Sequence, residues 1–101
     1  MIRFTRTAVV AGGHVAEAMG FAGKVTQFVN GRYPDAGLQW GLQVGGTVGT
    51  LHWTMDLPDL ASLDRIFREL SMDGEYTSLV DASGEVFVPG RSHDAIVSLV
   101  G

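Results

Sequence analysis

Two runs of alternating residues in the middle of the chain constrain its fold most. In residues 38–44 every second side chain is large and apolar, and Gln39, Gly41 and Gln43 lie between them. Residues 48–56 alternate in the same way, with Thr50, His52 and Thr54 between the apolar side chains. Because successive side chains of a strand point to opposite faces, each run predicts a strand. The glycine-rich link at residues 45–47 predicts that the two strands form a hairpin.

Other segments of the chain supply further strands and helices. Residues 2–10 are rich in β-branched side chains and predict a strand, and a helical apolar stripe follows from residue 14 to about residue 33. A second stripe begins after Asp59 and runs from Leu60 to Leu70. Residues 75–82 predict a short helical piece. Residues 85–88 predict a short edge strand that Pro89-Gly90 stops, and residues 93–100 predict the final strand.

The order of these elements, β-α-β-β-α-β, predicts one ferredoxin-like domain over residues 1–101. In this α+β fold, four antiparallel strands form one layer and two helices cover one face of the sheet. With 46% hydrophobic and 18% charged residues, the chain has the composition of a folded protein. One hundred and one residues are enough for a single domain and too few for two.

Composition also excludes several classes of function. The formal net charge of −4 argues against a nucleic-acid partner, because such partners require a basic face. The absence of cysteine rules out disulfides, thiolate metal sites and cysteine nucleophiles. No apolar run approaches the roughly 18 residues that span a bilayer, and the first residues lack a signal-peptide cleavage pattern. We therefore expect a cytoplasmic protein without membrane insertion.

The face of the predicted hairpin that the helices leave uncovered is polar but carries no charge. It consists of Gln39, Gly41, Gln43, Thr50, His52 and Thr54. Sheet faces exposed to bulk water usually carry Lys, Glu or Arg. A charge-free face therefore predicts a partly buried surface, which either meets a second copy of the chain or encloses a ligand.

These patterns resemble the dimeric α+β barrel superfamily, and NIPSNAP-like proteins within it. The resemblance rests on the element order, on residues 51–56 after the hairpin link, on the step Asp73-Gly74-Glu75-Tyr76, and on residues 86–90 before residues 93–96. It covers nearly the whole chain and implies a homodimer in which two sheets pack face to face. The superfamily includes cofactor-free monooxygenases of aromatic polyketides, polyketide cyclases, lactone isomerases and haem-degrading enzymes. Haem-degrading members place a histidine on a helix as iron ligand, and the second helix here has none.

His52 is the candidate catalytic residue, because its side chain titrates near neutral pH and lies in the middle of a strand on the polar face. It could equally be a structural histidine bonded to a glutamine or at a dimer interface. Gln39, Gln43 and Thr54 share its face and could orient a ligand; alternatively, the glutamines bond across the dimer. Arg6 is unusual in mid-strand and could bind an anionic ligand or pair with an acidic side chain.

No metal site or cofactor is expected. The three histidines lack metal-ligand spacing, and His14 and His93 fall at element ends, where capping or surface roles are common. No phosphate-binding glycine loop or nucleophile elbow occurs. Trp40 and Trp53 are predicted core residues, with ligand stacking as the alternative.

Two functions remain open. The chain is either a small cofactor-independent enzyme, such as a monooxygenase or cyclase that binds a hydrophobic or aromatic molecule, or a non-catalytic homodimeric binding or assembly module. The volume of empty space inside the protein distinguishes the two functions, because a ligand site needs roughly 300 Å³ whereas a pure interface is densely packed.

Overall fold

The computed structural model of the chain describes all residues, 1–101. Its strands are β1 (Ile2–Val10), β2 (Gln39–Leu42), β3 (Thr50–Leu57) and β4 (Phe87–Ser98). Its helices are α1 (Val15–Arg32), the 3₁₀ turn η1 (Pro34–Ala36), α2 (Leu60–Ser71) and α3 (Gly74–Asp81). The strands form one antiparallel sheet in the order β2-β3-β1-β4. The predicted ferredoxin-like two-layer fold is confirmed, and none of the helices has the length and apolarity needed to cross a membrane.

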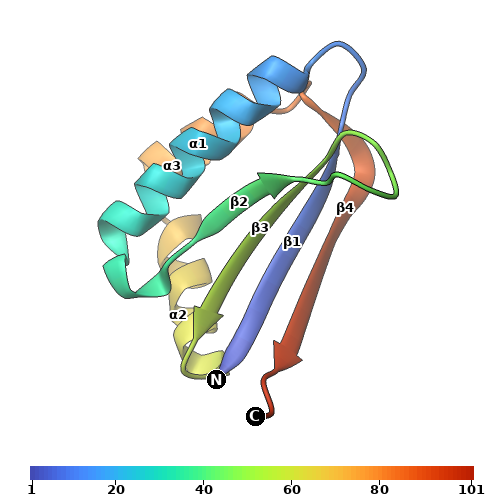
Figure 1. Cartoon of the computed structure of the whole chain (residues 1–101). Coiled ribbons are helices and arrows are strands. Elements are labelled where there is room, and N and C mark those ends of the chain that lie inside the picture. Colours follow the sequence, from blue (N-terminus) through green and yellow to red (C-terminus); the bar gives the residue numbers. More distant parts are fainter.

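All three helices lie on one face of the sheet (Figure 1). That helix-covered face carries the apolar residues of the central strands, among them Phe4, Leu51 and Trp53. Apolar stripes of α1 and α2 complete a core of 18 buried hydrophobic residues. β4 is the edge strand farthest from α1 in Figure 1, and its residues from Pro89 onward are all exposed. The helices therefore cover the sheet unevenly and leave the β4 side open.

The strand pairing fixes which side chains share a face, since paired residues point to the same side. Arg6 of β1 pairs with Trp53 of β3 and Asp94 of β4, so all three lie on the helix-covered face. Thr7 pairs with His52 and His93, so these three lie on the open face. The predicted facing of β3 is confirmed. Strand β1 places Arg6 on the side of the helices.

The last strand differs from the prediction. It runs unbroken from Phe87 to Ser98, although Pro89-Gly90 was expected to stop it. The pairing register shifts between Ala8 and Val10, so residues 88–91 form a bulge opposite Val9. An edge strand tolerates a proline because one side of it has no partner, and Gly90 adopts the positive φ of +75° that the bulge requires. As a result His93 lies inside the strand and not at its end.

The hairpin is confirmed, but its strands are shorter than predicted. β2 ends at Leu42, β3 begins at Thr50, and Val44 and Val48 in the connecting loop are almost completely exposed. Gly49 has φ +80°, which is outside the range of an extended strand, so β3 cannot begin before Thr50. The open face also carries an unpredicted ion pair, because Asp56 accepts two bonds from Arg3, at 2.8 and 3.0 Å.

Helix α2 begins as predicted, with Asp59 accepting a hydrogen bond from the backbone N–H of Ser62. Its apolar stripe starts one turn late, because Leu60 in the first turn is 59% exposed. On its exposed side Asp64 forms an ion pair with Arg68. Glu69 accepts a hydrogen bond from the Tyr33 hydroxyl.

Candidate functional site

A cavity of about 350 Å³ lies between the sheet and the helices. It is lined by 17 residues, of which 14 are hydrophobic; they come from β1, β3, β4 and all three α-helices, except Leu38 and Ser83, which lie in connecting segments. This volume lies within the range of small-molecule sites, which begins at about 300 Å³. The cavity is therefore large enough for an organic ligand and would hold it in a mainly apolar environment.

Aromatic rings form much of the wall. Phe21 of α1, Trp53 of β3 and Phe87 of β4 make one cluster, with ring centroids 5.6–6.3 Å apart. Phe4 of β1 and Phe67 of α2 make a second cluster at 5.1 Å, in an edge-to-face arrangement. Ring faces and edges of this kind favour a flat, ring-containing guest.

Trp53, a residue of this apolar wall, carries an unused hydrogen-bond donor. Its side chain is buried, with 6% of the residue exposed, and its indole Nε1 is the one buried side-chain nitrogen or oxygen in the protein without a hydrogen-bond partner. A buried donor without an acceptor costs about 1–3 kcal/mol. An acceptor atom on a bound molecule would remove this cost, so the donor favours a ligand with a carbonyl or similar oxygen.

Arg6 is the charged residue of the cavity lining, and its ion-pair partner on β4, Asp94, lies just outside that lining. Arg6 donates from Nε and Nη2 to the two carboxylate oxygens of Asp94, at 2.7 and 2.8 Å. The guanidinium also lies 5.5 Å from the centre of the Phe4 ring and 5.7 Å from that of Phe67. The bond to Arg6 lowers the pKa of Asp94, and the same bond raises the pKa of Arg6. Both side chains are about 40% exposed, so the pair marks the side on which the cavity meets solvent.

Helix α3 brings Tyr76 to the cavity. Asp73 caps this helix by accepting the backbone N–H groups of Glu75 and Tyr76, both at 3.0 Å. Arg32 at the end of α1 donates to the same Asp73 carboxylate, which ties α3 to α1. Burial raises the pKa of the Tyr76 phenol, which stays neutral at physiological pH and can donate or accept a hydrogen bond.

Of the residues that the sequence predicts for a site, only Arg6 lines this cavity. The other four lie on the open face of the sheet, on β2, β3 and the adjoining loop. Gln39 pairs with Thr54 across the strands, and His52 Nε2 lies 2.6 Å from Gln43 Oε1. The structure therefore joins His52 to Gln43, as the structural interpretation of His52 expected, and separates these four residues from Arg6 by the thickness of the sheet.

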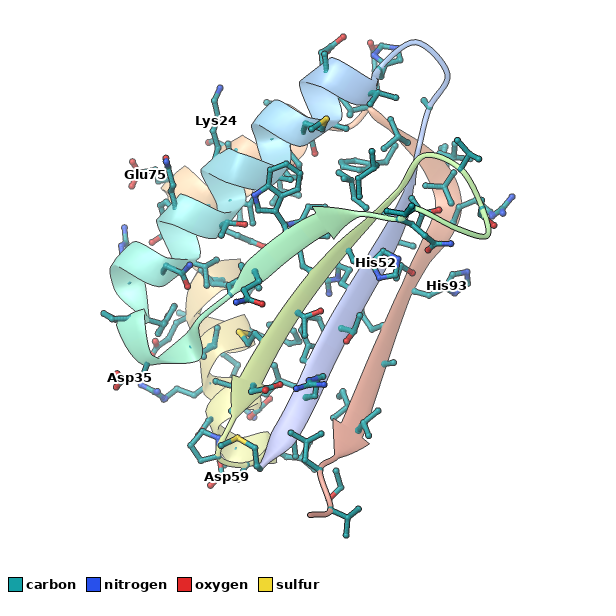
Figure 2. The ribbon with its side chains drawn as sticks, in the orientation of Figure 1. Lys24, Asp35, His52, Asp59, Glu75 and His93 are labelled. Atoms are coloured by element: carbon teal, nitrogen blue, oxygen red, sulfur yellow. The ribbon has the colours of Figure 1, made fainter.

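His93 joins the open face as well. Thr7 lies between His52 and His93 in one cross-strand row, and Figure 2 shows both histidines on the sheet away from the helices. No group of three or more His, Asp or Glu side chains is arranged to hold a metal ion. The open face thus presents a broad, weakly polar surface with a single ion pair, Arg3–Asp56.

Sequence reasoning missed most of the polar residues of the cavity. The lining residues Tyr76, Ser83 and Ser92 were not singled out as site residues, and neither was Asp94, the partner of Arg6 outside the lining. One signal did exist: an arginine in mid-strand between Phe4 and Ala8 needs an acidic partner nearby. Asp94 lies directly opposite Arg6 once β4 is aligned with β1.

Similar folds occur among solved structures. An uncharacterised NIPSNAP domain protein from Burkholderia xenovorans superposes with a TM-score of 0.83 over 99% of this chain and 95% of its own, at 15% identity. A NIPSNAP family protein from Agrobacterium tumefaciens gives 0.83 over 98% and 92%, at 12% identity. The chain has a NIPSNAP-like fold.

A solved structure that is not described as a NIPSNAP protein has a similar fold. An antibiotic biosynthesis monooxygenase superposes on this NIPSNAP-like chain with a TM-score of 0.71 over 100% of both chains, at 15% identity. The predicted resemblance to the dimeric α+β barrel superfamily is thereby confirmed at the level of the fold. No family model matches the sequence, and no curated protein matches it.

Proposed function

We propose that this protein binds a small, mainly apolar, ring-containing molecule with a carbonyl oxygen in the cavity between its sheet and its helices. The observation that carries the proposal is the buried Trp53 Nε1 donor, which lacks a partner and belongs to a residue of the cavity wall. Folded proteins rarely leave a buried donor unsatisfied, so such a group is expected where a ligand supplies the acceptor.

A titration with 9-fluorenone, a flat tricyclic ketone, tests this proposal. Val80 lines the cavity and is 38% exposed, so Val80→Trp should fill the cavity while leaving the fold intact. Val15→Trp is the matched control, because Val15 is 41% exposed on α1 and does not line the cavity. We expect the wild type and Val15→Trp to bind 9-fluorenone and Val80→Trp to lose binding. Equal binding by all three proteins would reject the cavity as the site.

Native mass spectrometry of the protein as purified from cells complements the titration. A bound molecule of a few hundred daltons would provide the natural ligand for identification. The same spectrum reports the number of copies, since one chain has a mass of 10.8 kDa.

We further propose that the open face of the sheet pairs with a second copy of the chain. The face is weakly polar, and its central residues Thr5, Thr7, His52 and Thr54 are only half-exposed before any partner is added. His52 and Gln43 would then serve the interface between the copies. Sedimentation velocity should show a dimer, and Thr54→Arg should shift it to monomer because pairing of the faces would bury a charge without a partner. A monomeric wild-type protein would refute this pairing.

A second candidate function is cofactor-independent oxygenation of the bound molecule. Trp53 Nε1 and the N–H groups of Arg6 not used by Asp94 are donors that could stabilise an enolate oxygen. A solved structure of the same fold is an antibiotic biosynthesis monooxygenase. Anthrone is a suitable probe: its CH₂ group reacts with one O₂ to give the carbonyl of anthraquinone and one water. Oxygen uptake above that of Val80→Trp would support an enzyme, whereas binding without uptake would support a non-catalytic binding module.

A further inference from the structure

We infer that Asp94 determines the charge of the ligand, so that the cavity selects neutral carbonyl compounds and rejects carboxylates of the same shape. This inference rests on the proposed binding function and specifies the class of ligand. It follows from the position of Arg6 in the cavity wall and from the two hydrogen bonds by which Asp94, just outside the lining, occupies donors of Arg6.

The pair leaves the cavity with a cation that is already neutralised. Arg6 is the only basic residue in the lining, and Asp94 holds it through two hydrogen bonds of 2.7 and 2.8 Å. An incoming carboxylate would gain attraction from Arg6 and meet comparable repulsion from Asp94. It would also lose its hydration among 14 hydrophobic lining residues, without compensation from a free cation.

A neutral carbonyl oxygen meets no such penalty. A guanidinium has five N–H donors, of which Asp94 occupies two, one on Nε and one on Nη2. The remaining donors on Arg6 are free for a neutral acceptor, and the proposed binding function assigns the unpartnered Nε1–H of Trp53 to the same role. The cavity therefore offers donors without offering net positive charge.

A substitution at Asp94 should change which ligand charge the cavity selects. Asp94 lies on the edge strand β4 and is exposed to solvent. Asparagine has nearly the same shape and can still accept a bond from Arg6, so Asp94→Asn removes the charge and leaves the wall in place. The uncompensated guanidinium should then attract an anion.

Two fluorenone derivatives of nearly equal size test the inference: 9-fluorenone-2-carboxylate and 9-fluorenone-2-carboxamide. At pH 7 the wild type should bind the carboxamide more tightly than the carboxylate. Asp94→Asn should shift the ratio of the two dissociation constants toward the carboxylate by about five- to tenfold at low salt, and less at high salt. Asp94→Ala should shift it in the same direction. Asp64→Asn is the control, because it removes one negative charge from an exposed pair on α2, outside the cavity.

The outcomes separate this inference from the proposed function. Wild-type protein that binds the carboxylate as tightly as the carboxamide overturns the role of Asp94 while leaving the cavity as the site. An equal shift in Asp94→Asn and Asp64→Asn also overturns it, because net charge alone would then explain the effect. Failure of the wild type to bind 9-fluorenone or either derivative would reject the binding function itself, and the inference with it.

Discussion

Replacing Trp53 by phenylalanine removes the indole donor and keeps an aromatic ring beside Phe21 and Phe87. Replacing 9-fluorenone by fluorene removes the acceptor from the ligand, because fluorene has a CH₂ group in place of the carbonyl. The four combinations of protein and ligand form a thermodynamic cycle, which isolates the bond between Nε1–H and the carbonyl oxygen.

The size of the effect follows from the burial of the donor. Nε1 is buried without a partner, so the protein has already incurred a desolvation cost of about 1–3 kcal/mol. Binding 9-fluorenone recovers this cost, but the ketone gives up a hydrogen bond to water. We therefore expect a coupling of about 1–2 kcal/mol, since each 1.4 kcal/mol is a tenfold change in affinity. The preference of the wild type for 9-fluorenone over fluorene should thus exceed that of Trp53→Phe by about 5- to 30-fold.

Calorimetric or fluorescence-displacement titrations can measure the four dissociation constants, with circular dichroism to verify that Trp53→Phe folds. Preferences that agree within about twofold in the two proteins would refute the reasoning, because additive changes agree to about 0.3–0.5 kcal/mol. The donor would then not face the ligand, however tightly the ligand binds.

Three further predictions concern stability, pH and assembly. Leu51→Ala should lower the free energy of unfolding by about 2–5 kcal/mol in denaturant titrations, because Leu51 is completely buried in the core outside the cavity lining; a loss below about 1 kcal/mol would contradict the packing described. Stability should fall as the pH drops below about 4, because bonds to Arg6 and to the N–H groups of α3 lower the pKa values of Asp94 and Asp73 below those of the unfolded chain. Thermal unfolding as a function of pH checks this, and stability that rises on acidification would contradict it. His52→Ala should weaken self-association in sedimentation experiments and leave the affinity for 9-fluorenone unchanged, since His52 and the cavity lie on opposite faces of the sheet; a loss of ligand affinity would place the site on the open face.

Much of the fold could be predicted because local patterns agree with the tertiary arrangement. Alternation in residues 50–56 identifies both faces of β3, and the glycine-rich link identifies the hairpin. The continuity of β4 across Pro89-Gly90 could not be predicted, because a proline next to a glycine usually ends a strand, and only the register against β1 shows the bulge that accommodates them. Exposed ends such as Val44 and Leu60 likewise match the apolar pattern without being buried.

The candidate site was harder to predict for a different reason. A cavity is space that the packing of helices on a sheet leaves unfilled, and no local pattern encodes it. The lack of charge in the hairpin residues of the open face indicated a binding surface. The cavity, in contrast, is lined by residues such as Trp53, whose sequence pattern is that of ordinary core residues. Arg6 was the one visible clue, and its meaning depended on Asp94, which is 88 residues away in the sequence.

The most direct test of the central claim is the ¹H–¹⁵N NMR signal of the Trp53 indole Nε1–H during addition of 9-fluorenone. The chain has two tryptophans, so Trp40 gives an internal reference, and Trp53→Phe assigns the pair. A bond to the ketone should move the Trp53 proton downfield, and fluorene should not reproduce that shift. If 9-fluorenone binds and the Trp53 signal stays in place, the cavity donor does not hold the ligand and the account is wrong.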